Sequence, residues 1–188
     1  MPKLLLIKHS EPVVDPELPP SKWKLSDRGI QRADLLAAYL ADRSIDMLYS
    51  SSEAKAMRTA EIIGATTGLP IIVLHDLREH DRENTPVVGA EQWRSQVVES
   101  IHRQDELIYG AEPVADARKR FGKTIRKIMQ PAQVQIVAVV THGTVISTFA
   151  AEMLNIDPVP IWDSLGLPGL IEIEWPRPSK ILSRRNFD

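Results

Sequence analysis

The chain contains no cysteine, which excludes disulfides, thiolate catalysis and zinc sites that need sulfur ligands. It also lacks any run of about 18 apolar residues that could cross a membrane. The first residues carry one lysine and a short apolar run without a cleavage-like site, so we expect no signal peptide and a cytoplasmic protein. The net charge of −2 is spread along the chain, which argues against a nucleic acid or an anionic membrane as partner.

The length and composition are those of an ordinary globular protein. A chain of 188 residues is long enough for one domain with a full core and too short for two such domains. Apolar residues make up 43% of the chain and charged residues 26%, which is an average balance. We therefore expect a single domain over residues 1–188.

Strand-like and helix-like segments alternate along most of the chain. Ser26 is a suitable N-cap for a helix that runs to about Asp42, and Gly68 suits the left-handed position after a second helix. This alternation predicts an α/β fold, a three-layer α/β/α sandwich with a mostly parallel central sheet. The expected strands cover residues 4–7, 45–49, 71–74, 136–141, 170–175 and 180–183, with the third buried and the last two paired at a sheet edge. Further helices are expected near residues 93–101, 114–128 and 145–154.

Three of the expected strands end in similar polar residues. The first strand is followed by Lys8-His9-Ser10, the second by Ser50-Ser51-Ser52 with Lys55 soon after, and a later one by Thr141-His142-Gly143. The carboxyl ends of parallel strands lie at one edge of a sheet, where ligands bind in open α/β folds. Two histidines, two lysines and two helix N-termini would then converge, and helix N-termini favour anions. The sequence thus predicts an anion site in which a neutral histidine could attack phosphorus.

The charged segment His75–Asn84 requires a separate interpretation. A run of this density is usually a solvated loop, and we expect that of most of its residues. It contains two His-Asp pairs, but their spacing matches no metal-ligand set, so no metal site is predicted.

Five motifs in order make the chain resemble the histidine phosphatase superfamily, which has the phosphoglycerate mutase-like fold. The opening Arg-His-Gly-Glu of that family is similar to Lys8-His9-Ser10-Glu11, and its Leu-Thr-x-x-Gly-x-x-Gln-Ala is similar to the segment Leu25–Ala33. Its Tyr-Ser-Ser-Pro-Leu-x-Arg-Ala-x-x-Thr-Ala resembles Tyr49–Ala60. Its Leu-x-Glu and its late Thr/Ser-His-Gly match Leu77-Arg78-Glu79 and Thr141-His142-Gly143.

The resemblance implies a role for each matching position. His9 would attack the phosphoryl group and become phosphohistidine, and Glu79 would protonate the leaving oxygen and later help to activate water. Lys8, Lys55 and His142 would hold the phosphoryl oxygens and stabilise the transition state. The family implies a small phosphomonoester or other phosphorylated ligand as partner, and neither a metal nor an organic cofactor.

Several positions depart from the family pattern. Both phosphate-binding arginines are replaced by lysines, Lys8 and Lys55, which are point charges rather than planar forks. A loss of about 1.5 kcal/mol for each replacement would slow the reaction about a hundredfold. Ser10 replaces a glycine and could crowd the phosphate or donate a hydrogen bond to it, while Arg58 lies one helical turn after Lys55 and could supply a guanidinium. The glycine and aromatic residue that usually follow the acid motif are missing after Glu79.

These departures leave three functions open. The first is a phosphomonoesterase that works through a covalent phosphohistidine on His9 and is slowed by the lysines. The second is a non-catalytic relative that binds a phosphorylated ligand or a protein. A phosphoglycerate-type mutase is the least favoured, because 188 residues leave little room for the segments that retain its intermediate. Substrate specificity should depend on the loops near 11–24 and 80–112.

Overall fold

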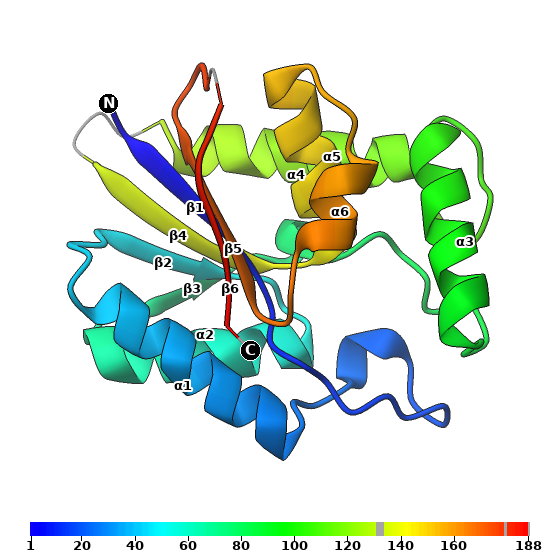
Figure 1. The fold of residues 1–188 in the computed structure, drawn as a ribbon, viewed down its shortest axis with the longest axis horizontal. Coiled ribbons are helices and arrows are strands. Elements are labelled where there is room, and N and C mark those ends of the chain that lie inside the picture. Colours follow the sequence, from blue (N-terminus) through cyan, green and yellow to red (C-terminus); the bar gives the residue numbers. More distant parts are fainter. Residues whose placement is uncertain (131–133, 179, 188) are drawn as a thin grey trace.

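The computed structural model describes residues 1–130, 134–178 and 180–187. In this part of the chain a six-stranded sheet lies between two layers of helices, in the strand order β3-β2-β4-β1-β5-β6 (Figure 1). The strands are β1 (Lys3–Lys8), β2 (Met47–Ser50), β3 (Ile71–Val73), β4 (Ile136–Thr141), β5 (Gly169–Glu174) and β6 (Ile181–Asn186).

The sheet is mostly parallel, as predicted. β1, β2, β3 and β4 all run in the same direction, and β5 runs antiparallel to β1. β6 pairs antiparallel with β5 at the outer edge, so the expected β pair near the end of the chain is confirmed. The right-handed crossovers of parallel strands require helices on the faces of the sheet, and Figure 1 shows such a layer on each face.

The helices divide between the two faces of the sheet. α1 and α2 cover one face, and α4 and α5 cover the other, while α3 and α6 lie beside the carboxyl ends of the strands (Figure 1). Their bounds are α1 (Asp27–Ala41), α2 (Ala54–Thr67), α3 (Ala90–His102), α4 (Val114–Ile128), α5 (Gly143–Leu154) and α6 (Val159–Ser164), with 3-10 turns η1 (Pro20–Lys22) and η2 (His75–Leu77).

Side chains of the central strand β1 contribute to both hydrophobic clusters of the core, one on each face of the sheet. Its side chains alternate between the faces, as the period of a strand requires. Leu4 and Leu6 pack into the cluster beneath α4 and α5, and Leu5 and Ile7 pack into the cluster beneath α1 and α2. All four are buried, so β1 is the fully buried strand that its continuous apolar run predicts.

The predicted capping residues of two helices are confirmed. The Ser26 hydroxyl accepts a hydrogen bond from the Gly29 N–H at 2.9 Å, which caps α1. Gly68 ends α2 with φ +74°, a left-handed conformation that glycine adopts at little cost.

Other details of the sequence-based prediction were wrong. The third strand is not buried: β3 lies at an edge of the sheet, and 44% of Val73 is exposed. The short helix α6 was not predicted. His80 is a buried exception within the charged segment, most of whose residues were expected to be solvated. None of the described helices combines the length and the apolar character that a membrane span needs.

Candidate active site

The register of β1 and β4 brings the two strand-end histidines together. The strands pair in parallel with Lys8 opposite Thr141, so the next residues, His9 and His142, emerge side by side. Their ring centroids are 5.1 Å apart, with an angle of 62° between the ring planes. The sheet itself therefore sets the distance between the two imidazoles.

His9 is held as a neutral imidazole with one free nitrogen. Its Nδ1 lies 2.7 Å from the Ser10 carbonyl oxygen, and because a carbonyl only accepts, Nδ1 carries the hydrogen. Burial, followed by the nearby charge of Lys55 and by His142, lowers the pKa of His9 well below its usual value. At neutral pH Nε2 thus keeps its lone pair, as a nucleophile must.

His142 packs edge-on against His9 and is completely buried. Its Nε2 lies 2.8 Å from the Ser51 hydroxyl and 3.4 Å from the carboxylate of Glu53. Burial lowers the pKa of His142 well below its usual value, and Lys55 and other cations act in the same direction. Its Nδ1 is buried and has no hydrogen-bond partner among the described residues.

Lys8 lies in the wall of the cleft that contains His9. Its ammonium donates a hydrogen bond to the Leu165 carbonyl at 2.9 Å. Burial lowers the pKa of Lys8 to about 8, although the negative charge of Glu79 opposes the shift. Lys8 is therefore mainly cationic at neutral pH and loses its proton only slightly above it.

Lys55 is buried in the same cleft and is bound by two groups of the protein. Its ammonium donates to the Pro20 carbonyl at 2.7 Å and forms a short ion pair with Glu53. Burial by itself raises the pKa of Glu53, but Lys55 and further hydrogen bonds hold that pKa below its usual value. The family pattern quoted above has a leucine at position 53, so this buried pair is a feature of the present chain.

Glu79 sits at the N-terminus of α5. Its carboxylate accepts hydrogen bonds from the backbone N–H groups of Thr144 at 3.1 Å and Val145 at 3.2 Å. The N–H of His80 donates to the same carboxylate at 3.0 Å. Free N–H groups at a helix N-terminus favour a negative charge, so α5 fixes Glu79 in the wall of the cleft.

Arg120 on α4 supports Glu79 from behind and was missed by the sequence analysis. Its guanidinium donates to the carbonyl oxygens of Asp76, Arg78 and Glu79, each at 3.0 Å, and forms an ion pair of 2.6 Å with Glu112. These bonds tie the turn that carries Glu79 to α4. No local pattern around position 120 could have predicted the three bonds to carbonyl oxygens, because those acceptors belong to a distant loop.

Ser10 and Arg58, two residues expected to bind the phosphate, do not line the cleft. The Ser10 hydroxyl donates to the Gly29 carbonyl at 2.6 Å, so it points to α1 rather than into the cleft. Arg58 has 51% of its side chain exposed and pairs with Glu61 on the surface of α2. Lys8, His9, Lys55 and Glu79 line one cavity, with His142 behind His9, whereas Ser10 and Arg58 lie outside that group.

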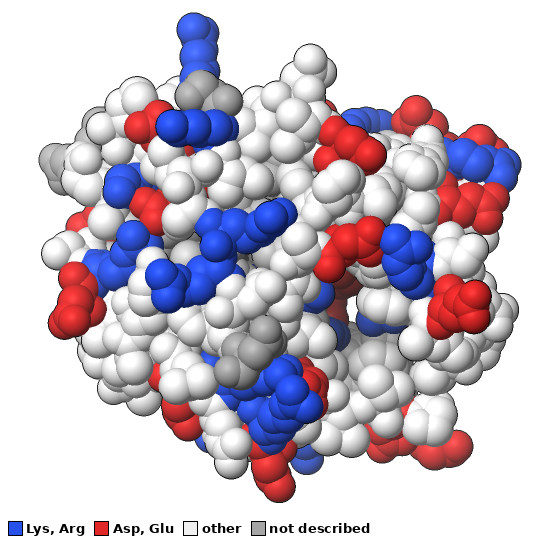
Figure 2. Space-filling model, viewed as in Figure 1, with Lys and Arg blue, Asp and Glu red and all other residues white. Residues whose placement is uncertain are grey.

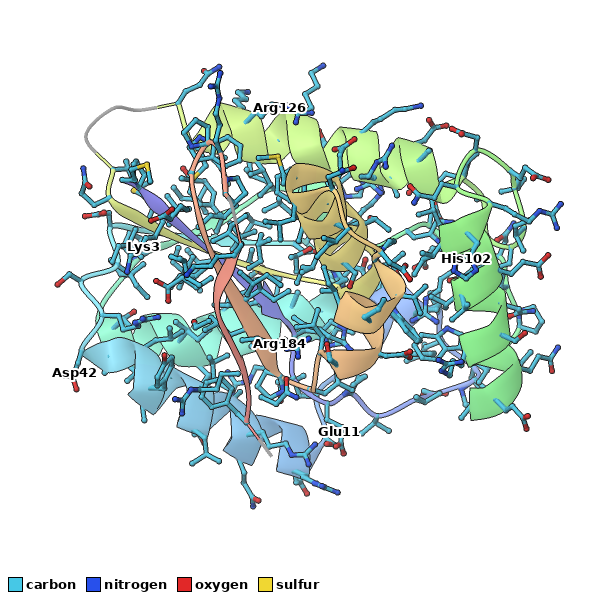
Figure 3. The ribbon with its side chains drawn as sticks, turned by 45° about the horizontal axis from the view of Figure 1, so that its top comes forward. Lys3, Glu11, Asp42, His102, Arg126 and Arg184 are labelled. Carbon is cyan, nitrogen blue, oxygen red and sulfur yellow. The ribbon has the colours of Figure 1, made fainter. Side chains whose placement is uncertain are left out.

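The cavity beyond these residues has a volume of about 700 Å³. In Figure 2 the surface is hollowed between α3 and the rest of the molecule, and side chains of both charges lie at the rim. Glu11, which follows the β1 strand end, lies near the start of α1 (Figure 3) and pairs with Arg32 at 2.7 Å. Among the described residues, no three His, Asp or Glu side chains come together as metal ligands would.

Comparison with known sequences identifies relatives among phosphatases. The sequence profile of the histidine phosphatase superfamily (branch 1) matches residues 13–187. The chain is 28% identical to the uncharacterized phosphatase PhoE of Bacillus subtilis over 71% of this chain and 66% of that protein, just under two thirds of the relative's length. It is 26% identical to phosphoserine phosphatase 1 of Hydrogenobacter thermophilus, over 86% of this chain and 81% of the relative.

Solved structures have the same fold. A mycobacterial glucosyl-3-phosphoglycerate phosphatase superposes with a TM-score of 0.77 at 20% identity, covering 99% of this chain and 97% of that one. A phosphoserine phosphatase of Entamoeba histolytica, solved in complex with phosphoserine, has a TM-score of 0.77 at 19% identity, covering 98% and 96%. At these identities the likeness establishes the fold.

Proposed function

Since this chain belongs to the histidine phosphatase superfamily, we propose that it hydrolyses small phosphomonoesters through a covalent phosphohistidine on His9. The observation that carries the proposal is the state of His9, a buried neutral imidazole with Nδ1–H held by a carbonyl and Nε2 free. It shares its cleft with two lysine ammonium groups, Lys8 and Lys55. A nucleophile beside fixed cations suits attack on a phosphoryl group, whose charge spreads over its oxygens in the transition state.

The reaction would proceed in two steps. An ester that binds as the monoanion brings one proton, which the carboxylate of Glu79 takes up. Nε2 of His9 then forms a bond to phosphorus while the bond from phosphorus to the ester oxygen breaks, and Glu79 passes that proton to the departing oxygen. Water then attacks the phosphohistidine, Glu79 takes a proton from that water, and inorganic phosphate leaves with His9 restored. Lys8, Lys55 and the free Nδ1 of His142 would contact the phosphoryl oxygens in both steps.

The decisive experiment compares two histidine variants with the wild type on an aryl phosphate. We expect His9→Ala to lower kcat by at least about 10³-fold, because the covalent route disappears. The matched control is His102→Ala, since His102 is exposed at the end of α3, away from the cleft (Figure 3). Retention of activity in His9→Ala would contradict the proposed nucleophile.

One observation favours a second candidate, a non-catalytic protein that binds a phosphorylated ligand. Both cations are already bound by protein groups, Lys55 by Glu53 and Lys8 by the Leu165 carbonyl. If this is the function, the wild type is inactive on every ester tried, and turnover appears only after Lys8→Arg and Lys55→Arg restore the family arginines. An active wild type whose activity depends on His9 would exclude this alternative.

A further inference from the structure

We propose that the cleft selects phosphomonoesters whose alcohol part is apolar and carries an aromatic ring. This inference rests on the proposed function, because it places the phosphoryl group at His9 and asks what surrounds the remainder of the ester. We call the end of the cavity that contains His9 the phosphate end. Beyond it, the cavity wall is dominated by apolar side chains from segments far apart in the sequence. They include Val14, Trp23, Val87, Trp93, Tyr109 and Trp162.

Three of the four tryptophans of the chain line this wall. Trp93 on α3 and Trp162 on α6 have ring centroids 5.3 Å apart in a tilted arrangement. The guanidinium of Arg82 lies 5.4 Å from the ring centroid of Trp93 and 5.4 Å from that of Trp23. Rings and a stacked guanidinium offer flat faces, and an aromatic group in a ligand packs favourably against such faces.

The hydrogen-bonding groups of the wall are outnumbered by apolar ones and include Glu11, Arg82, Thr85, Gln96, Tyr109 and Asp163. Its two carboxylates are compensated by the protein, Glu11 by Arg32 at 2.7 Å and Asp163 by Arg94 at 2.7 Å. Arg82 has no acidic partner among the described residues, but its guanidinium is placed against the two indole rings. A polar alcohol part would lose water against this wall and gain few hydrogen bonds in return, which disfavours its binding.

Trp93 adds one polar atom to the apolar wall. Its Nε1 is buried and has no hydrogen-bond partner among the described residues. Buried polar groups without a partner are rare in native proteins. Because this nitrogen has almost no exposed surface, the part of Trp93 that a ligand meets is the apolar ring.

The test uses two esters that differ only in a phenyl group, ethyl phosphate and 2-phenylethyl phosphate. Both release a primary alcohol, so their chemical reactivity is similar and their kcat/KM ratio reports contact with the wall. We expect the phenyl ester to be preferred by at least about tenfold, the range that apolar pockets achieve. Phosphoserine and 3-phosphoglycerate should be hydrolysed with a lower kcat/KM than the phenyl ester.

Variants of the wall show where the preference arises. Trp93→Ala should reduce the ratio towards one, and Trp175→Ala is the matched control, because Trp175 lies outside the cavity. Val87→Asn gives a second test without risk to the core, since 43% of Val87 is exposed. It should lower kcat/KM for 2-phenylethyl phosphate more than kcat/KM for ethyl phosphate, and so lower the ratio.

The outcomes separate this inference from the proposed function. Equal kcat/KM for the two esters, or a preference for phosphoserine or 3-phosphoglycerate, overturns the inference and leaves the phosphatase proposal intact. If neither ester is hydrolysed, the proposed function fails, and binding decides the inference. Tighter binding of 2-phenylethyl phosphate than of ethyl phosphate, followed by tryptophan fluorescence and calorimetry, would support it, and equal binding would overturn it.

Discussion

The two ends of the cleft are built in different ways. At the phosphate end, His9, Lys55 and His142 are nearly or completely buried. His9 and His142 follow strands β1 and β4 directly, and Lys55 lies in the first turn of α2, the helix after β2. At the outer end the wall comes from the loops before α1 and α3 and from the helices α3 and α6. Its side chains include Val14, which is 53% exposed, and Val87, which is 43% exposed.

Under the proposed function, this difference separates chemistry from specificity. The sheet register fixes the spacing of the phosphate-end groups, so a change there requires the core to shift. The exposed loop positions of the outer wall, such as Val14 and Val87, can change at little cost in stability. Variants at the phosphate end should therefore alter the chemical step for all esters, and variants of the wall should alter the choice between esters.

Among the variants of the phosphate end, we expect Glu79→Gln to change activity most. Loss of the proton donor should lower kcat for ethyl phosphate by about 10²–10⁴-fold. Measured as kcat/KM, which does not include the later attack of water, the loss should be much smaller for 4-nitrophenyl phosphate, because nitrophenolate leaves without protonation. Steady-state kinetics with the two esters measures the difference. Equal losses would mean that Glu79 only holds the N-terminus of α5, where it accepts two backbone hydrogen bonds.

A smaller effect, in the opposite direction, is expected from Lys8→Arg combined with Lys55→Arg. An arginine has five N–H donors, so one at position 55 could keep the contact with Glu53 and still bind phosphate. At about 1.5 kcal/mol for each replacement, kcat/KM should rise by up to about a hundredfold for every ester. Lys119→Arg on the surface of α4 is the matched control. An unchanged or lower kcat/KM would mean that the site is adapted to lysine.

The pH dependence of kcat/KM should report the charge of Lys8 at the phosphate end of the cleft. Burial lowers the pKa of Lys8 to about 8, so its positive charge is present below that pH and is lost above it. The kcat/KM of the wild type should therefore fall about tenfold per pH unit above about 8. The single variant Lys8→Arg should remove this decline, because arginine does not lose its proton in that range. A wild-type profile without the decline would show that the charge of Lys8 is not needed.

The smallest effect is expected from Ser10→Gly. The Ser10 hydroxyl donates to the Gly29 carbonyl, so its removal should cost about 1 kcal/mol of unfolding free energy. Because the hydroxyl points away from the cleft, kcat/KM should remain nearly unchanged. Urea unfolding and steady-state kinetics test the two halves of this prediction. A tenfold gain in kcat/KM, about 1.4 kcal/mol, would instead place Ser10 against the phosphate.

The sequence predicted the phosphate end better than the outer wall, and the reason is topological. Parallel strands bring their carboxyl ends to one edge, so the positions of His9 and His142 follow from the strand pattern alone. The direction of a side chain after the strand does not follow from it. Ser10 turns to α1 and Arg58 to the surface, although their spacing was compatible with the phosphate site.

Local sequence patterns could not predict which side chains become buried or which distant segments come into contact. The pair of Glu53 with Lys55 is local, but its significance depends on burial that only the packed fold provides. Trp93 and Trp162 meet through the placement of α3 and α6, and α6 was itself not predicted. The edge position of β3 likewise depends on strand order, since an apolar run reads the same in a central strand and an edge strand.

Phosphohistidine mapping tests the central claim most directly. Wild-type protein is mixed with an isotopically labelled aryl phosphate, quenched within milliseconds under alkaline conditions, digested and examined by mass spectrometry. The account predicts an acid-labile phosphoryl group on the peptide that contains His9, formed at the rate of turnover and absent from His9→Ala. A phosphoryl group on His142 instead, or turnover by the wild type with no phosphorylated histidine at any time, would contradict it.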